Sequence, residues 1–254
     1  MFAQERHKEI IDILNKEGKV VVKELSRKFN LTEDCIRKDL KFLEGKRLLK
    51  RTYGGAIPVR KPAQVQDIEL RKHKNVESKL IIAKKAFNII EENDTIFLDI
   101  STTNILLAEE ILKQNKKVTV ITNMLDIVSI LRNANNNVKV ICIGGVLNKE
   151  LNSFTGSAAI ENMSDYRPDK AFIGSCGVNI FDKSITTFDV EDGNTKKSIL
   201  KNSRKSYLVM ENSKFYFDGT YKFSSLYDIN GIITDDEPGK DILKLIGETD
   251  TVVI

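Results

Sequence analysis

From residue 76 onward, short apolar runs alternate with stretches in which apolar residues recur at helical spacing. The strand-like runs cover residues 95–100, 118–122, 138–143, 170–174, 206–210 and 229–234. Helices are expected between them: one marked by Leu80, Ala83, Phe87 and Ile90, one up to Leu112, one up to Leu131 and one near 192–201. This alternation is typical of a mainly parallel sheet covered by helices. We therefore predict an α/β fold for this part of the chain.

The first 57 residues follow a different pattern, made of shorter segments. They comprise helical spacing over 5–16, a β-like run at 20–22, a second helix over 23–29, a third helix after Thr32, and a run over 48–53 that meets Gly54-Gly55. Thr32 is a good N-cap, and the third helix buries a stripe in which Ile36, Leu40 and Leu43 recur at i, i+4 and i+7. The Gly-Gly pair is typical of a hairpin tip. Three short helices and a hairpin predict a winged helix-turn-helix.

These patterns divide the chain into two domains and a connection. We predict a winged helix-turn-helix DNA-binding domain over 1–57 and an α/β domain over 76–254. The segment 58–75 between them begins with Pro58, also contains Pro62, and has no clear periodicity, so we interpret it as a linker.

Charge is unevenly distributed between these parts. The first 60 residues contain 15 Lys and Arg against 9 Asp and Glu, whereas the remaining 194 contain 25 against 27. A basic head on a nearly neutral body indicates an anionic partner for the head, and DNA, RNA and a membrane surface all fit that description.

Several classes of protein are disfavoured by the sequence. The apolar runs are far shorter than the ~20 residues of a membrane span, and the first residues lack an apolar signal-peptide region. Cys35, Cys142 and Cys176 have no metal-binding or redox spacing, so we expect reduced thiols in the cytoplasm and no metal site. Glycine-rich phosphate loops of the NTPase or dinucleotide type are also missing, so no cofactor is expected.

The third helix carries the residues that favour DNA among the anionic partners. Arg37, Lys38 and Lys41 lie on one side of it, opposite the buried stripe. A helix fits the major groove, where such cations reach base edges or phosphates. On the hairpin, Lys50, Arg51 and Tyr53 are placed to contact the flanking backbone. A plain solvated face is the alternative interpretation of such charges.

The head resembles that of the DeoR family of bacterial sugar-metabolism regulators. The resemblance rests on RHKEIIDIL, on LTEDCIRKDLKFLE and on RTYGGA. It implies that Thr32, Arg37 and Lys38 contact operator DNA. Four positions depart from the family pattern: Val21 at the N-cap of the second helix, Cys35 in place of Thr, Tyr53 in place of His, and Arg47 where Gly is usual, with Gly45 expected to make the turn instead.

In the α/β part, polar or glycine-rich segments follow the predicted strands. FLDISTTN (97–104) ends an apolar strand in hydroxyls and begins a helix, where backbone N–H groups suit a phosphate. IGGVLN (143–148) and FIGSCGVN (172–179) are further glycine turns at strand ends, where open α/β sheets bind ligands. Lys196 and Lys214 are candidate counter-cations. A tight turn or a surface lysine is the simpler interpretation of each segment alone.

These segments also resemble the C-terminal domain of the DeoR family, so the likeness covers nearly the whole chain. It implies a Rossmann-like fold, similar to ribose-5-phosphate isomerase, that senses a phosphorylated sugar. The residues that fall on the matching effector positions are Asp99, Ser101, Thr102, Thr103, Gly144, Gly145, Lys196 and Lys214. Cys176 and Asn179 stand where the family has acids.

Two functions remain open from the sequence, together with a weaker third. The favoured one is a repressor of a sugar-catabolic operon that binds double-stranded operator DNA as a homodimer or homotetramer and responds to a sugar phosphate. The second is a sugar-phosphate isomerase with an accessory head, which Cys176 and Asn179 disfavour because neither is a ready acid or base. The third makes the head an RNA-binding or protein-binding module.

Overall fold

The computed structural model describes residues 2–63, 67–135 and 137–254. The chain divides into two compact units, one made of Met1–Lys61 with Pro238–Glu248 and the other of Pro62–Glu237 with Thr249–Ile254. Each unit has its own buried core.

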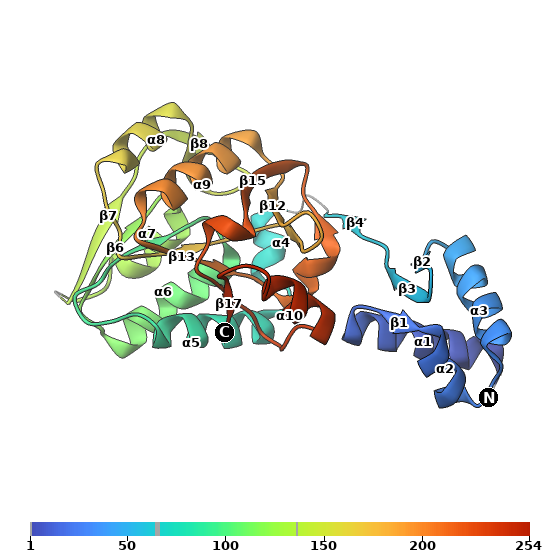
Figure 1. Ribbon diagram of the computed structural model, residues 1–254. Coiled ribbons are helices and arrows are strands. Elements are labelled where there is room, and N and C mark those ends of the chain that lie inside the picture. The colour runs from blue at the N-terminus through green and yellow to red at the C-terminus, as the bar shows by residue number, and fades with distance from the viewer. Residues whose placement is uncertain (1, 64–66, 136) are drawn as a thin grey trace. The chain divides into compact units, whose positions relative to one another are not determined.

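The first unit is the expected winged helix-turn-helix (Figure 1). Its elements are α1 (Ala3–Glu17), β1 (Val20–Val21), α2 (Val22–Phe29), α3 (Glu33–Gly45), β2 (Leu49–Thr52) and β3 (Gly55–Pro58), and the later segment contributes α10 (Lys240–Ile246). The three strands form an antiparallel sheet in the order β1-β3-β2. The predicted stripe of Ile36, Leu40 and Leu43 is buried against α1 residues that include Ile10 and Leu14.

The turn after α3 differs from the expectation that Gly45 makes it. Gly45 is the last helical residue, and Arg47 takes the left-handed conformation with φ of 56°. The N–H of Leu48 then donates to the carbonyl of Leu43 over 3.0 Å, which closes the helix end. The turn is therefore made by Arg47 in a left-handed conformation and not by a glycine, at a steric cost.

The second unit is built on a seven-stranded parallel sheet in the order β17-β16-β13-β10-β5-β6-β7. Its strands are β5 (Thr95–Leu98), β6 (Val118–Thr122), β7 (Val138–Cys142), β10 (Lys170–Ile173), β13 (Lys205–Val209), β16 (Gly231–Ile233) and β17 (Val252–Val253). The helices around it are α4 (Ile68–Lys72), α5 (Val76–Asn88), α6 (Thr102–Gln114), α7 (Leu125–Leu131), α8 (Ser157–Ser164) and α9 (Val190–Asn202). The predicted parallel α/β fold is confirmed.

Both faces of this sheet are covered. Ile96 and Leu98 of β5 belong to a core that α5, α6 and α7 share, whereas Phe97 between them is equally buried and faces the other way. Helices α8 and α9 lie across the sheet from α5 and α6 (Figure 1). A sheet covered on both faces needs apolar residues at successive positions. Its strands could therefore be predicted from continuous apolar runs in the sequence.

Smaller elements were not predicted. They are β4 (Lys61–Pro62), the hairpin of β8 (Val146–Asn148) and β9 (Ser153–Thr155), the antiparallel sheet of β11 (Gly177–Asn179), β12 (Ser184–Thr187) and β15 (Tyr221–Ser225), the short strand β14 (Phe217–Asp218) and the 3₁₀ helices η1 (Asn212–Tyr216) and η2 (Leu226–Asp228).

Two local predictions need correction. The segment 58–75 is not irregular throughout, because Asp67 caps α4 by accepting the N–H of Glu69 over 2.9 Å, and Ile68 lies in the core of the second unit. Residues 64–66 of this segment lie outside the described residues. On α5, Ala83 of the predicted apolar positions is buried but Leu80 is 37% exposed, and Lys79 and Ile82 complete the buried face. A buried lysine shifted the apparent apolar stripe.

Candidate functional site

The outer face of α3 carries the predicted DNA-contacting cations. Thr32 caps the helix by accepting the N–H of Cys35 over 3.3 Å. Lys38 and Lys41 are exposed and form no ion pair with any described residue. Because the buried stripe fixes the rotation of α3, these two ammonium groups point away from the core.

Arg37 does not project freely, contrary to the sequence expectation. Its Nη2 lies 2.7 Å from Glu33 Oε2 and its Nη1 lies 2.9 Å from Asp34 Oδ1. These acids stand four and three residues earlier, where they face Arg37 on the same helix. The pairs are exposed, and such pairs contribute little stability, so a phosphate or a base edge can displace the acids.

On the hairpin of β2 and β3, too, one cation is paired with an acid while other predicted contact residues are exposed. Arg51 is held by Glu44, with Arg51 Nε 2.6 Å from Glu44 Oε2 and the N–H of Arg51 2.9 Å from Glu44 Oε1. Tyr53 at the tip is fully exposed, and Lys50 is exposed beside it. The contact with Glu44 links the hairpin to the end of α3.

Sequence reasoning missed a buried ion pair in this unit. Asp39 Oδ2 lies 2.7 Å from Arg6 Nε, Asp39 Oδ1 lies 3.0 Å from Arg6 Nη2, and His7 Nε2 is 2.8 Å from Oδ1. Burial alone raises the pKa of Asp39, but the hydrogen bonds from Arg6 and His7 outweigh burial and lower it. The available signal was an acid adjacent to Leu40, on the buried side of α3. This pair joins α1 to α3.

The candidate site of the second unit lies at the carboxyl ends of the central strands. Asp99 follows β5 directly and is fully buried. Its Oδ2 accepts the N–H of Gly174, which follows β10, over 2.9 Å. Asn104 of α6 donates to the carbonyls of Asp99 and Phe172 over 2.9 and 2.8 Å, so it fixes the ends of both strands. A Cβ on Gly174 would lie 2.9 Å from the carbonyl oxygen of Ile100, so this approach requires glycine.

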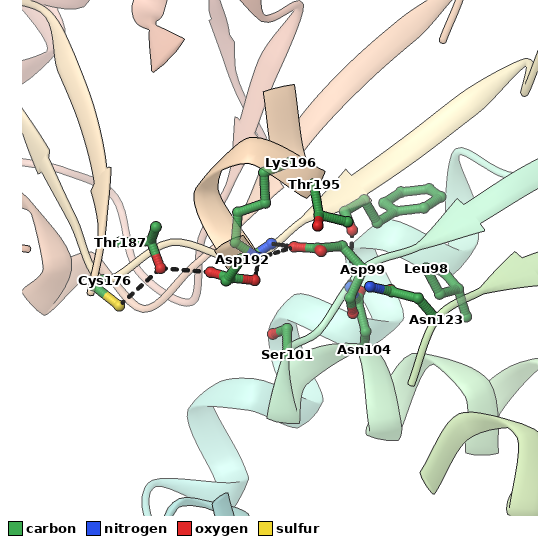
Figure 2. A network of polar contacts seen from close by, with 12 residues as sticks. Leu98, Asp99, Ser101, Asn104, Asn123, Cys176, Thr187, Asp192, Thr195 and Lys196 are labelled. Carbon is green, nitrogen blue, oxygen red and sulfur yellow. Dashed lines mark hydrogen bonds and ion pairs between the residues drawn. The ribbon is translucent and has the colours of Figure 1, made fainter. Parts of the chain in front are cut away.

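Lys196 of α9 reaches between two carboxylates (Figure 2). Its Nζ lies 2.5 Å from Asp99 Oδ2 and 2.9 Å from Asp192 Oδ1, which forms the Asp99–Lys196–Asp192 triad. The three residues are 0%, 2% and 4% exposed for Asp99, Lys196 and Asp192. Thr187 donates to Asp192 Oδ2 over 2.6 Å, and the thiol of Cys176 lies 3.8 Å from the Thr187 hydroxyl.

Burial and mutual charge set the titration of the triad. Burial raises the pKa of Asp99; Lys196 lowers it, Asp192 raises it, and the net result is about 6. Burial lowers the pKa of Lys196, but the two carboxylates outweigh burial and raise it above its ordinary value. Lys196 is therefore charged at neutral pH and already neutralised by the protein. The sequence singled out Lys196 as a candidate counter-cation; the structure pairs its ammonium with two carboxylates, and its part in effector binding stays a prediction.

The other predicted effector residues fall into two groups. Ser101 caps α6 by accepting the N–H of Thr103 over 3.1 Å, and Thr102 and Thr103 are buried beside it with hydroxyls that hydrogen-bond to no other described residue. Gly144 and Gly145 lie outside the triad. A Cβ on Gly145 would lie 2.8 Å from the carbonyl oxygen of Thr155, which gives this glycine a packing role. Lys214 on η1 is partly exposed, 6.0 Å from the ring centre of Phe217.

Asp192 and Thr187 were not singled out by the sequence. The spacing of Asp192 and Lys196 was available as DGNTK, because residues four apart face each other on a helix. Lys196 and Asp99 are 97 residues apart in the sequence, so no local pattern indicates that they form a pair. Asp99 Oδ1 is buried and accepts no hydrogen bond from any described residue.

The described residues form neither a cluster of metal ligands nor a membrane-spanning helix. No group of three or more His, Cys, Asp or Glu side chains among them is arranged to hold a metal ion. None of the helices they form combines the length and the apolar character needed to cross a bilayer.

Comparison with known proteins gives two family matches and related whole chains. Residues 6–61 match the DeoR-like helix-turn-helix domain, and residues 74–236 match the DeoR C terminal sensor domain. The chain is 34% identical to the lactose phosphotransferase system repressor of Staphylococcus epidermidis over 91% of each chain. It is 28% identical to the glycerol-3-phosphate regulon repressor of Escherichia coli, over 95% of this chain and 94% of that one. Ribose 5-phosphate isomerase A of Methanocaldococcus jannaschii aligns with a TM-score of 0.41 at 16% identity, over 56% of this chain and 55% of that chain.

Proposed function

Because this chain belongs to the DeoR family of transcriptional regulators, we propose that it represses a sugar or sugar-phosphate catabolic operon in the cytoplasm. Two relatives are named as repressors of the lactose phosphotransferase system and of the glycerol-3-phosphate regulon, which supports this class of target. The first unit binds double-stranded operator DNA, and the second binds a phosphorylated sugar that changes the affinity for DNA.

One observation carries the DNA-binding proposal. The helix α3 is capped by Thr32 and contacts α1 through Asp39. It presents Lys38 and Lys41, which form no ion pair with any residue that the structure describes. A major groove admits such a helix, and lysines there contact guanine edges and phosphates. We assign Lys38 together with Arg37 to base reading, and Lys41, Arg51 and Tyr53 to the backbone.

A single head reads few base pairs, so the proposal includes a homodimer or homotetramer that places two heads on repeated half-sites. The effector acts by binding one arrangement of the assembly better than another, as any ligand-driven shift requires. Asp99, Ser101, Thr102 and Thr103 are the proposed effector contacts closest to the sheet, and Lys214 is the proposed cation. Lys196 acts through its hold on Asp99.

A catalytic role is disfavoured by the same residues. Isomerisation of an aldose to a ketose needs a carboxylate that moves a proton between adjacent carbons. Asp99 is the carboxylate at the strand ends, but Lys196 and the N–H of Gly174 both occupy its Oδ2. Cys176 is buried, which raises the pKa of its thiol, and Asn179 does not titrate.

The test measures DNA binding by fluorescence anisotropy, with an operator selected from a random duplex library and a scrambled duplex. Lys38→Ala should weaken operator binding about tenfold or more and leave scrambled-duplex binding less affected. Lys41→Ala should weaken both and reduce the salt slope by about 1. Lys8→Ala removes the same charge from the exposed face of α1 and is the matched control. If both α3 variants bind both duplexes as the control does, α3 is not the recognition helix.

A further inference from the structure

The outer face of α5 exposes large apolar side chains. Among the exposed large apolar residues that the structure describes, four fall within residues 70–81: Leu70, Val76, Leu80 and Ile81. Leu80 is 37% exposed and Ile81 is 45% exposed, although both lie in the middle of the helix. The opposite face of α5 lies in the core of the second unit. A single exposed apolar residue needs no explanation, whereas a group of them on one helix face indicates a contact surface.

Charged residues flank this apolar pair on the same face of the helix. The exposed stripe of α5, spaced at three and four residues, consists of Glu77, Leu80, Ile81, Lys84 and Asn88. Neither the carboxylate of Glu77 nor the ammonium of Lys84 forms an ion pair or a hydrogen bond with a residue that the structure describes. The helix therefore presents an acid, an apolar pair and a base, in this order, along one face.

This order is self-complementary when two copies of α5 pair in opposite directions. A two-fold axis that passes between Leu80 and Ile81 places each of these residues opposite the other one in the second copy. Glu77 and Lys84 stand at equal spacing on either side of the apolar pair, so the same axis places Glu77 of each copy opposite Lys84 of the other. A parallel pair would instead bring like charges together. The charges therefore favour the antiparallel arrangement.

We propose that two copies of this chain associate through the outer face of α5, as an antiparallel pair of helices with Leu80 and Ile81 at its centre. The inference rests on the proposed function, in which two DNA-binding heads occupy repeated half-sites, and it names the surface that joins the copies. Burial of the apolar pair drives the association, and Val76, four residues before Leu80, extends the apolar surface. The two contacts between Glu77 and Lys84 fix the direction of the helices.

The first experiment measures the association of the full chain by sedimentation velocity over a range of protein concentrations. Ile81→Glu places an acid from each copy at the centre of the helix pair and should weaken association about tenfold or more. Leu147→Glu is the matched control, because it makes the same change on β8, where Leu147 is 44% exposed. The control should associate within about twofold of the wild type. Thermal unfolding checks that both variants are folded.

The second experiment exchanges the charges and tests the direction of the helices. Glu77→Lys places lysines opposite each other and Lys84→Glu places acids opposite each other, so each variant alone should associate about tenfold more weakly than the wild type. A mixture of the two variants pairs a lysine with an acid at both contacts and should associate within about threefold of the wild type. Mixing would not repair a helix that either substitution had made less stable, so this recovery identifies a contact between copies.

A wild type that stays monomeric at every concentration, or an Ile81→Glu variant that associates as Leu147→Glu does, overturns the inference. A mixture of charge variants that associates no better than its components also overturns it. Operator binding separates this inference from the regulatory proposal. The wild type and Ile81→Glu should bind an isolated half-site alike, but the wild type should gain more affinity on a duplex with two half-sites. Loss of sequence-specific binding by the wild type overturns the regulatory proposal, whereas specific binding with association that does not depend on α5 overturns this one.

Discussion

Replacing Lys196 with methionine distinguishes a ligand-binding lysine from a structural one. If Lys196 were a free counter-cation, Lys196→Met would weaken effector binding and leave the stability of the ligand-free protein nearly unchanged. In the structure its ammonium lies 2.5 Å from Asp99 and 2.9 Å from Asp192, so the substitution leaves two buried carboxylates without their cation. The expected effect is therefore a large loss of stability in the absence of any ligand.

The size of the loss follows from two limits. Removing one partner of a buried ion pair typically costs about 3–5 kcal/mol. A stranded carboxylate can instead take up a proton, and for a group with pKa 3.8 in the unfolded chain this costs about 4 kcal/mol at pH 7. Both limits place the deficit of Lys196→Met at about 3–5 kcal/mol at neutral pH.

The pH dependence of the deficit identifies its cause. The wild type gains stability on the order of 1 kcal/mol between pH 7 and pH 5, because Asp99 takes up a proton near its pKa of about 6. In Lys196→Met a carboxyl that is already protonated at pH 7 gains roughly twice as much stability over the same interval. The deficit should therefore narrow by about 1 kcal/mol on acidification.

Urea denaturation at the two pH values measures these free energies, and hydrogen–deuterium exchange of β5 and α9 assigns the loss to the second unit. Lys201→Met removes an exposed lysine from the same helix and should change stability by less than about 0.5 kcal/mol at either pH. A Lys196→Met deficit as small as that of the control, or one that does not narrow at pH 5, would refute the triad as the source of stability.

Two further predictions concern buried carboxylates. Asp39→Ala strands the Arg6 guanidinium and should destabilise the first unit by about 3–5 kcal/mol, seen as faster hydrogen exchange in α1 and α3, whereas Asp12→Ala on the exposed face of α1 should not. Asp99→Asn should remove a pH dependence of the free energy of unfolding. The pKa of Asp99 is about 6 in the folded chain and 3.8 in the unfolded chain, so the folded chain binds more protons between these pH values. Wild-type stability should therefore fall by about 3 kcal/mol as the pH rises from below 3.8 to above 6. Equal slopes for Asp99→Asn and the wild type in urea titrations would contradict the raised pKa.

The parts of the fold that could be predicted are those in which burial is continuous along the chain. Strands such as β5 and β6 are covered on both faces, so their apolar runs were unmistakable. The strand β12 is equally buried but reads SITT, and its hydroxyl residues resemble a loop. Likewise α5 has Lys79 on its buried face, whereas Leu80, one of the apolar residues that indicated the helix, is exposed.

The site could be predicted in residue type better than in role. Sequence analysis singled out Asp99, Lys196 and Lys214, but it could not give their partners, because Asp99 and Lys196 are joined only by the fold. The same limit applied to Arg37. Its charge could be read from the sequence, but its contacts with Glu33 and Asp34 depend on side-chain rotamers, which the sequence does not give. Local spacing in the sequence predicts which charged side chains a site can contain. Long-range packing decides which of these side chains are already paired with an opposite charge.

The net charge of the triad in the second unit also restricts how a sugar phosphate can be oriented beside it. The triad has two carboxylates for one ammonium, so a phosphate placed beside it would meet a net negative charge. Asp99 Oδ1 is buried and has no hydrogen-bond donor among the described residues, so it is suited to accept a hydrogen bond from a sugar hydroxyl. We therefore expect a phosphorylated sugar to turn its hydroxyl end, and not its phosphate, towards Asp99. A sugar phosphate shortened so that its hydroxyls stop short of Asp99 should bind more weakly and fail to change the affinity for the operator, because the strand ends around Asp99 would contact no ligand.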